Sequence, residues 1–356
     1  MILDKFKERT LRHLESKGEP RGLYPISRSD LMYMEKCILC GSLSIAPLTE
    51  AYLQSQLNFF STSACVKCLY TFRTISPSYS WFKKCWRMIS TKRLEVFNPA
   101  VEAIRKQRYE KYHSLLSSYV RKPDVLDIGG GYGTGSQVFR DKGYYVEAVE
   151  AEDDKAYFMK EALGIPVYNE SIEAVLQSNK RKYGLILFSH CLEHLDDPVF
   201  VISRIKNLLD PKVGILYLEI PILWNSVTWS DALYLAHKSN FTEENLSYLL
   251  YKSGFEILEK VYFRHTVDEP LDLGLVLRLT RGQAVEKDQI LNGKRDVDDI
   301  RKLYRQGLPI NPGVPSYGVI KYNVPFIEHF YQTLRLDTKR AVKLHDSSEF
   351  ISFESV

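Results

Sequence analysis

Between residues 124 and 280, short apolar runs alternate with stretches in which apolar residues recur at helical spacing. Such alternation predicts strands and helices in turn, with parallel strands in one sheet and helices on both of its faces. The predicted strands are Asp124–Ile128, Tyr145–Glu150, Ile165–Tyr168, Leu185–Ser189, Lys212–Pro221, Phe255–Phe263 and Leu271–Leu279. The pattern therefore predicts an α/β fold built on a doubly wound sheet of about seven strands.

The composition is that of a globular protein, with 356 residues of which 45% are hydrophobic and 26% charged. No apolar run approaches the roughly eighteen residues of a membrane span, and the charged first residues predict no secretory signal. We therefore expect a cytoplasmic protein outside the membrane. Residues 1–120 carry 19 Lys and Arg against 10 Asp and Glu. This basic front would suit an anionic partner such as a nucleotide sugar or RNA, or it would be a solvated face.

Two Cys-x-x-Cys pairs, separated by 24 residues, lie before the alternating region. Their members are Cys37, Cys40, Cys65 and Cys68. This doubled spacing is typical of two knuckles that hold one tetrahedral Zn²⁺ through four thiolates. Gly41 fits the turn of the first knuckle, whereas Leu69 stands where the second knuckle often has a glycine. The alternative is four reduced cysteines packed as small apolar residues. We predict one structural zinc ion.

These patterns divide the chain into five parts. An aromatic and basic stretch follows the cysteines, and it is interpreted as a helical linker rather than a surface that stacks nucleic-acid bases. The predicted parts are an N-terminal extension (1–36), a zinc-binding module (37–80), a helical linker (81–118), a cofactor-binding domain (119–280) and a C-terminal extension of unknown role (281–356).

A glycine-rich turn follows the first predicted strand and leads into a helix that Thr134 is expected to cap. Such a turn is also found in dinucleotide-binding dehydrogenases, so the glycines alone do not identify the ligand. The order Asp-x-Gly-x-Gly-x-Gly resembles motif I of class I S-adenosylmethionine (SAM) methyltransferases, which have a Rossmann-like sheet. A carboxylate suits the methionine part of SAM but would repel a pyrophosphate. The resemblance implies cofactor contacts from Asp127, Gly129, Gly131 and Gly133.

Two further acids are candidates for cofactor binding. Glu150 ends the second predicted strand, 23 residues after Asp127, near the spacing at which a carboxylate meets ribose hydroxyls. A solvated surface acid is the alternative interpretation. In the methyltransferases that the chain resembles, groups after the third strand often contact adenine, and this implies a role for Glu170.

The segment Ser189–Pro198 follows the fourth predicted strand and resembles the same segment of many small-molecule methyltransferases. In an open α/β sheet, residues at this place border the ligand, so we expect Ser189 and His190 to lie beside the reacting methyl group. A neutral His190 imidazole would remove an acceptor proton near pH 7, or it would only shape the pocket. His194 is expected to be structural.

A second candidate base is His237, which follows Tyr234 in a short aromatic segment. Together with the cysteine pairs, this segment resembles the deoxysugar C-methyltransferases, in which a zinc-binding front precedes a SAM domain. Those enzymes often have a glutamate where this chain has Ala236. The resemblance implies catalytic roles for Tyr234 and His237, and the missing glutamate favours O- or N-methylation over C-methylation.

The sequence thus predicts a SAM-dependent methyltransferase that acts on a small polar metabolite, with sugars and nucleotide sugars as the first candidates. Three alternatives stay open: a NAD-dependent oxidoreductase, an RNA methyltransferase with a zinc-binding front, and a non-enzymatic SAM-fold interaction module. The modest net charge of +4 ranks nucleic acid below small molecules as a partner. The sequence does not indicate an oligomeric state.

Overall fold

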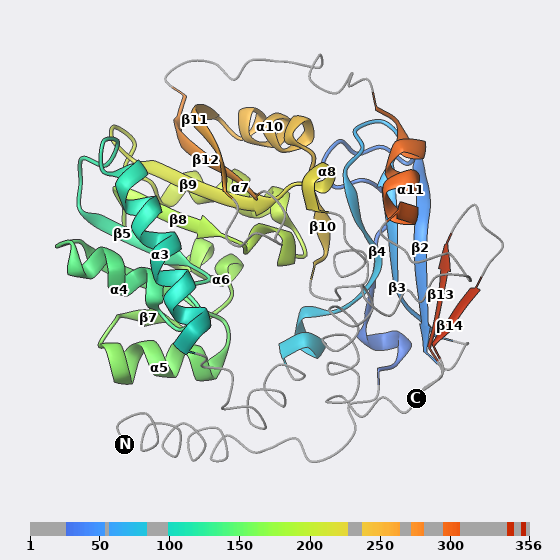
Figure 1. The fold of residues 1–356 in the computed structure, drawn as a ribbon, viewed down its shortest axis with the longest axis horizontal. Helices are drawn as coiled ribbons and strands as arrows, with labels where there is room; N and C mark the ends of the chain where they lie inside the picture. The colour runs from blue at the N-terminus through green and yellow to red at the C-terminus, as the bar shows by residue number, and fades with distance from the viewer. Residues whose placement is uncertain are drawn as a thin grey trace.

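The computed structural model contains two β-sheets that pack beside each other (Figure 1). It describes residues 26–53, 57–83, 99–226, 237–263, 272–280, 295–306, 340–344 and 350–353. Within these residues, no helix combines the length and the apolar character that crossing a membrane would require.

The main sheet has seven strands in the order β11-β12-β9-β8-β5-β6-β7. Strands β5 to β9 are parallel, and β12 runs antiparallel between β9 and β11. The bounds are β5 Asp124–Ile128, β6 Tyr145–Val149, β7 Val167–Tyr168, β8 Leu185–Ser189, β9 Ile215–Pro221, β11 Phe255–Phe263 and β12 Asp272–Leu279. The strand order reverses between β5 and β8, and ligands bind open α/β sheets at such switch points. The predicted doubly wound sheet is therefore confirmed, although β7 is shorter than expected.

Helices cover both faces of the main sheet because successive strand residues point to opposite sides. Val125 and Leu185 pack with α3 and α4 on one face, whereas Leu126 and Ile186 pack with α6, α7 and α10 on the other. The helix bounds are α3 Pro99–Leu116, α4 Thr134–Asp141, α5 Asp153–Leu163, α6 Ile172–Ser178, α7 Pro198–Ile205 and α10 Glu243–Lys252, with 3-10 turns η3 Leu192–His194 and η4 Lys206–Leu208.

Local sequence signals set most of the helix starts. Asp197 accepts a hydrogen bond from the backbone N–H of Phe200, and Thr242 accepts one from the N–H of Asn245, as expected of cap residues. The expectation that Thr134 caps α4 is wrong, because the cap position belongs to Gly133. The Thr134 hydroxyl instead donates to Glu102 of α3.

The second sheet, called the front sheet here, contains only antiparallel pairs. Its order is β1-β4-β3-β2-β13-β14, and β10 pairs with part of β4. The bounds are β1 Leu31–Tyr33, β2 Ile45–Leu53, β3 Leu57–Cys65, β4 Thr71–Pro77, β10 Ser239–Asn240, β13 Arg340–Leu344 and β14 Phe350–Phe353. A short η1 turn, Arg28–Asp30, precedes β1. The front sheet thus combines residues from both ends of the sequence, which the predicted division into five parts kept separate.

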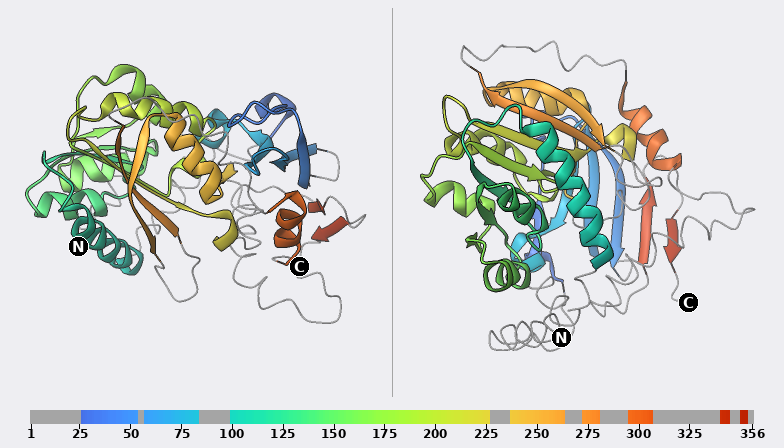
Figure 2. Two further views of the ribbon diagram at one scale, coloured as in Figure 1. Left: turned by 90° about the horizontal axis from the view of Figure 1, so that it is seen from above. Right: turned by 60° about the vertical axis from the view of Figure 1, so that its left-hand side comes forward.

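Two short helices, α8 Leu223–Ser226 and α11 Val297–Gln306, lie against the front sheet (Figure 2). Val297 and Ile300 of α11 share a small apolar cluster with Leu48 and Ala64 of the sheet. The C-terminal extension, whose role the sequence left unknown, thus contributes helix α11 to this cluster.

One hydrophobic core joins the two sheets. Cys68, in the turn between β3 and β4, and Phe72 of β4 pack in the same cluster as Leu246 of α10 and Phe188 of β8. In addition, the Asn245 side chain donates a hydrogen bond to the carbonyl of Cys68, 3.2 Å away. The cysteine-bearing part is therefore built into the domain that contains the main sheet.

Candidate active site

A cavity of about 620 Å³ opens at the carboxyl ends of β5, β6 and β8. Its volume falls within the range of small-molecule sites, and it lies where the strand order reverses. The glycine-rich turn after β5, the turns after β6 and β8, helix α3 and residues 79–83 all contribute to its wall. Six predicted site residues line the cavity, namely Gly129, Gly131, Glu150, Glu170, Ser189 and His190.

Asp127 and Gly133 were also predicted to bind a cofactor, but they are not among the residues that line the cavity. Asp127 is buried below the turn, where its Oδ2 accepts a 2.7 Å hydrogen bond from Ser136 of α4. Burial raises its pKa to about 6. A Cβ on Gly133 would lie 2.6 Å from Met159 of α5. These two residues therefore hold α4 and α5 close to the turn, so that its other residues reach the cavity.

Gly131 and Glu150 form the part of the wall that suits a ribose. Gly131 has a φ of +58°, and its N–H donates a 2.9 Å hydrogen bond to Glu150 Oε2. Oε1 of Glu150 accepts a second bond, 2.8 Å long, from the N–H of Glu152. Each carboxylate oxygen accepts more than one hydrogen bond, so ligand hydroxyls can still bind to the fixed carboxylate. Burial raises the pKa of Glu150 to about 7, against the opposing effect of Lys155.

His190 directly follows β8 and lies among three buried carboxylates. Its Nε2 is 3.4 Å from Asp272 Oδ2 and 3.5 Å from Glu219 Oε1, and its Nδ1 is 3.7 Å from Glu193 Oε1. Burial alone would lower the pKa of His190, but the carboxylates of Asp272, Glu193 and Glu219 raise it well above the usual value. This shift favours the charged imidazolium over the neutral imidazole that the sequence suggested.

Glu219 and Asp272 were not identified as site residues from the sequence. Glu219 lies in the middle of the apolar strand β9 and is fully buried, with a 2.7 Å hydrogen bond from the Tyr217 hydroxyl. Asp272 is the first residue of β12. The available signal was an acid inside an apolar strand run, because a carboxylate is rarely buried without a partner.

His237 is placed beside His194, with 4.8 Å between the ring centroids. His194, which the sequence predicted to be structural, lines the cavity, whereas His237 is not among the lining residues. Burial, together with the neighbouring His194, lowers the pKa of His237 to about 3. Tyr234, the third predicted catalytic residue, lies outside the described residues.

Helix α3 contributes a polar face that sequence reasoning treated as part of a linker. Glu102, Arg105, Arg108 and Tyr109 all line the cavity. Glu102, Arg105 and Arg108 follow one another at intervals of three, and Tyr109 comes four residues after Arg105, so all four lie on one face of the helix. This polar spacing was the available signal. Arg105 donates to Glu102 over 2.6 Å. The linker is therefore part of the site.

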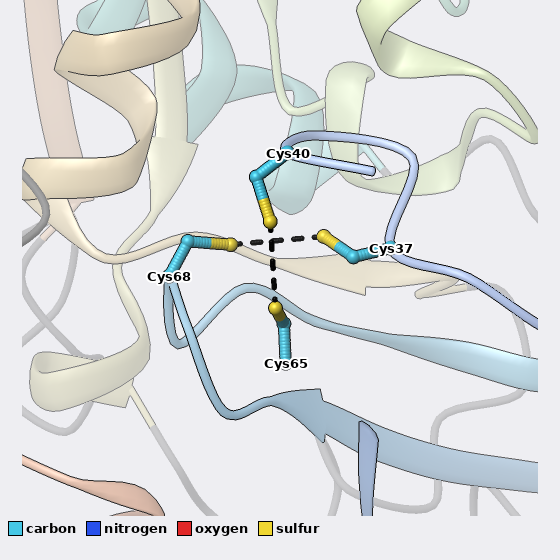
Figure 3. Close-up of side chains that lie close together, drawn as sticks. All are labelled: Cys37, Cys40, Cys65 and Cys68. Carbon is cyan, nitrogen blue, oxygen red and sulfur yellow. Dashed lines mark hydrogen bonds between the residues drawn. The ribbon is translucent and has the colours of Figure 1, made fainter. Parts of the chain in front are cut away.

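The four paired cysteines meet at one point, with their sulfur atoms facing a common centre (Figure 3). The Sγ atoms of Cys37 and Cys68 are 3.6 Å apart, and all four Sγ atoms lie within 4.8 Å of one another. Hydrogen bonding among the thiols lowers the pKa of Cys65 and raises that of Cys37. A group of this kind holds several thiolates only when a cation balances their charge.

The two knuckles have matching turns despite their different sequences. Gly41 has a φ of +76° and its N–H donates to the carbonyl of Cys37, while Leu69 has a φ of +57° and donates to the carbonyl of Cys65. Leu69 thus adopts the left-handed conformation that glycine would adopt more easily. The donor set and the two turns fit a tetrahedral zinc ion.

Comparison with known proteins agrees with this geometry. Residues 102–260 match a family described as a methyltransferase domain. This range contains the glycine-rich turn, Glu150 and the segment after β8. These residues, which make up a little less than half of the chain, are therefore similar to a methyltransferase domain. No curated protein matches the sequence significantly.

Several solved structures resemble part of this chain at low sequence identity. A SAM-dependent methyltransferase from Archaeoglobus fulgidus is 19% identical with a TM-score of 0.40, over 49% of this chain and 93% of that one. A 1,6-didemethyltoxoflavin-N1-methyltransferase from Burkholderia thailandensis is 18% identical with a TM-score of 0.45, and the match covers 66% of this chain and 99% of that one. A SAM-dependent methyltransferase from Leishmania major is 17% identical with a TM-score of 0.44, and the match covers 56% of this chain and 82% of that one.

The raised pKa of Glu150 predicts that cofactor affinity depends on pH. An ionised carboxylate accepts hydrogen bonds from both ribose hydroxyls, and protonation removes an acceptor, so affinity should fall as the pH drops below about 7. The limiting slope is about tenfold per pH unit. Calorimetric titration with S-adenosylhomocysteine from about pH 5.5 to 8.5 measures this.

The Glu150→Gln variant is the control for this titration, because its amide does not titrate. It should bind more weakly than the wild type at pH 8 and show a flatter profile. A wild-type profile without pH dependence, or one that the variant retains in full, would contradict the role of Glu150.

Proposed function

We propose that this protein transfers the methyl group of SAM to a small polar metabolite, with sugars and nucleotide sugars as the first candidates. The observation that carries the proposal is the Glu150 carboxylate, which two backbone N–H groups fix at the wall of a 620 Å³ cavity. This arrangement suits the two ribose hydroxyls of SAM, and Glu170 lies further along the same wall, where adenine would bind.

The methionine end of SAM would then lie towards β8, beside Ser189 and His190. SAM carries a positive sulfonium, and the buried carboxylates of Glu219 and Asp272 lie near this end of the cavity around His190. Methyl transfer is an in-line substitution, so the main tasks of the site are to position the acceptor and to exclude water.

The cations of the cavity wall support an anionic acceptor. Lys83, Arg105 and Arg108 line the cavity on the side of α3 and residues 79–83. Arginine and lysine bind phosphate groups through charge-assisted hydrogen bonds, so a sugar diphosphate would fit this side. Ala236 stands where deoxysugar C-methyltransferases often have glutamate, and this favours oxygen or nitrogen over carbon as the methyl acceptor.

The roles proposed for the histidines follow from their surroundings. A charged His190 holds Glu219 and Asp272 in place and does not act as a base at neutral pH. His237 is neutral but is not among the cavity-lining residues, so proton removal by His237 would have to pass through His194. Tyr234 precedes His237 by three residues in the sequence, and a catalytic role for it stays part of the proposal.

A structural Zn²⁺ on Cys37, Cys40, Cys65 and Cys68 is part of the proposal. The four sulfurs supply a complete tetrahedral set, and three of the four residues are buried, so the site is closed to substrates. The ion would stabilise the front sheet and take no part in methyl transfer. A cytoplasmic location also belongs to the proposal, because free thiols stay reduced there.

An RNA methyltransferase is the second candidate, since the same three cations would bind a phosphate backbone. A non-enzymatic interaction module is the third. Steep weakening of RNA binding as salt concentration rises would distinguish true RNA recognition from weak attraction to the basic front.

The cofactor assignment predicts that S-adenosylhomocysteine binds and that NAD does not. In the Gly131→Val variant, a side chain would enter the cavity, because the space around the Gly131 Cβ position contains only Arg105 Nη1, 4.0 Å away. We expect affinity for S-adenosylhomocysteine to fall by more than about tenfold. Calorimetric titration measures the affinity for S-adenosylhomocysteine and for NAD.

Gly143→Val is the matched control, because Gly143 also has a positive φ, +89°, and lies in the turn between α4 and β6. The control should keep full affinity although its backbone is strained in the same way. Binding of NAD alone by the wild type would refute the cofactor assignment.

The zinc assignment predicts that purified protein contains one zinc ion per chain. Cys40→Ser should lose this ion and should lower the free energy of unfolding by several kcal/mol, because metal binding is coupled to folding. Cys191→Ser is the control, since Cys191 lies outside the cysteine cluster. Metal analysis and thermal denaturation give the result, and full metal content with full stability in Cys40→Ser would exclude the site.

The acceptor assignment predicts that radiolabel from SAM appears in a nucleotide sugar when the protein is incubated with nucleotide sugars, phenols and RNA. Replacing Arg105 and Arg108 together with Gln should raise the KM for a phosphate-bearing acceptor by about tenfold and leave affinity for S-adenosylhomocysteine less affected. Label in RNA alone would overturn the small-molecule assignment and favour the second candidate.

A further inference from the structure

A second group of potential metal ligands lies beside the cavity, apart from the cysteines. It consists of Glu193 and His194 in the 3-10 turn after β8, and His237 in the segment that enters β10. One ligand atom from each of the three residues lies within 4.8 Å of the other two. The turn and the segment are more than forty residues apart in the sequence, so the fold alone brings these side chains together.

The surroundings of Glu193 indicate a cation. Its side chain is 1% exposed, and among the described residues neither carboxylate oxygen has a hydrogen-bond partner. Its ion pair with His190 Nδ1 spans 3.7 Å, which is too long for a hydrogen bond. A buried carboxylate is costly unless it is well paired or binds a metal.

The backbone holds the ligand-bearing segments together. The N–H of Lys238 donates a 2.8 Å hydrogen bond to the carbonyl of Glu193, which ties the segment of His237 to the turn of Glu193 and His194. On the other side, Arg73 of β4 donates through Nε to the carbonyl of His237 over 3.1 Å. The three side chains are therefore positioned before any ligand binds.

We propose that Glu193, His194 and His237 bind one divalent transition-metal cation at the wall of the cavity. Two imidazole nitrogens and one carboxylate oxygen suit Mn²⁺, Co²⁺ or Zn²⁺ better than Ca²⁺ or Mg²⁺, which prefer oxygen ligands. Of the three residues, His194 alone is among those that line the cavity, so the remaining coordination positions of the ion face the acceptor.

The chemical role of this ion rests on the proposed methyl transfer. An acceptor hydroxyl that binds the cation becomes more acidic and releases its proton to water. Its oxygen then forms a bond to the methyl carbon of SAM, while the bond from that carbon to sulfur breaks and leaves its electron pair on sulfur. The products are a methyl ether, S-adenosylhomocysteine and one proton.

The test measures metal binding itself. Protein dialysed against EDTA is analysed for the zinc that it keeps and is then titrated with Mn²⁺, with the free ion followed by electron paramagnetic resonance. We expect one Mn²⁺ per chain in addition to the cysteine-bound zinc. Glu193→Gln, His194→Asn and His237→Asn should each weaken Mn²⁺ binding by at least the roughly 10–100-fold that loss of an outer-shell partner costs.

His113→Asn is the matched control, because His113 lies on α3 against Phe139 and Tyr144, outside the group. It should bind Mn²⁺ as tightly as the wild type. Retained binding in all three ligand variants would overturn the proposal.

If a variant does not fold, metal binding by the wild-type protein tests the proposal. Absence of Mn²⁺ binding, together with absence of any Co²⁺ or Zn²⁺ beyond the cysteine-bound ion, would also overturn the proposal. A bound Co²⁺ that shows weak visible bands without intense sulfur charge transfer would support it. Calorimetry with S-adenosylhomocysteine is run in parallel, so that loss of metal binding alone contradicts this inference and loss of cofactor binding contradicts the proposed function.

Discussion

Buried negative charge at the carboxyl edge of the main sheet is the constraint on which the site depends. Glu150, Glu193, Glu219 and Asp272 are each at most 8% exposed, and all lie at or near this edge. Moving one carboxylate out of water costs several kcal/mol, while the net stability of a whole domain is only about 5–15 kcal/mol. Four such groups cannot all remain charged without compensation.

The molecule meets this constraint in three ways. Glu150 receives two backbone hydrogen bonds and has a pKa raised by burial, so part of its charge is neutralised by a proton. His190 becomes an imidazolium between Glu219 and Asp272. A sulfonium cofactor would bring a further positive charge to the same edge. The preference for a cationic ligand therefore follows from the burial of the acids, before any specific contact is considered.

The front sheet supports this edge directly. Strand β4 pairs with β10, and Arg73 of β4 donates hydrogen bonds to the carbonyls of His237 and Lys238. The position of His237 therefore depends on a strand that begins three residues after Cys68. The cysteine cluster and the cavity are parts of one packed unit, so a structural change at the four sulfur atoms would alter the positions of the histidine side chains.

Much of the main sheet could be predicted because its signals are local. Apolar runs predict the strands, and helix starts such as those at Asp197 and Thr242 depend on one side chain and the next turn. Residues that meet only through tertiary packing were missed. Glu219 and Asp272 come from strands paired in the sheet, and Arg105 belongs to a helix whose site-facing side cannot be chosen from periodicity alone. Thr134 was misplaced because Glu102, distant in sequence, competes for its hydroxyl.

The pairing of β2 with β13 has a consequence for synthesis of the protein. Thr49 pairs with Leu344, which lies 295 positions later. At roughly 5–20 residues per second, a ribosome needs about 15 to 60 seconds to make the intervening chain. Throughout that time the outer edge of β2 presents open N–H and C=O groups, which can pair with other chains. The strands that are translated first thus belong to the sheet that is completed last, and the nascent chain needs protection at this edge while the main sheet is being made.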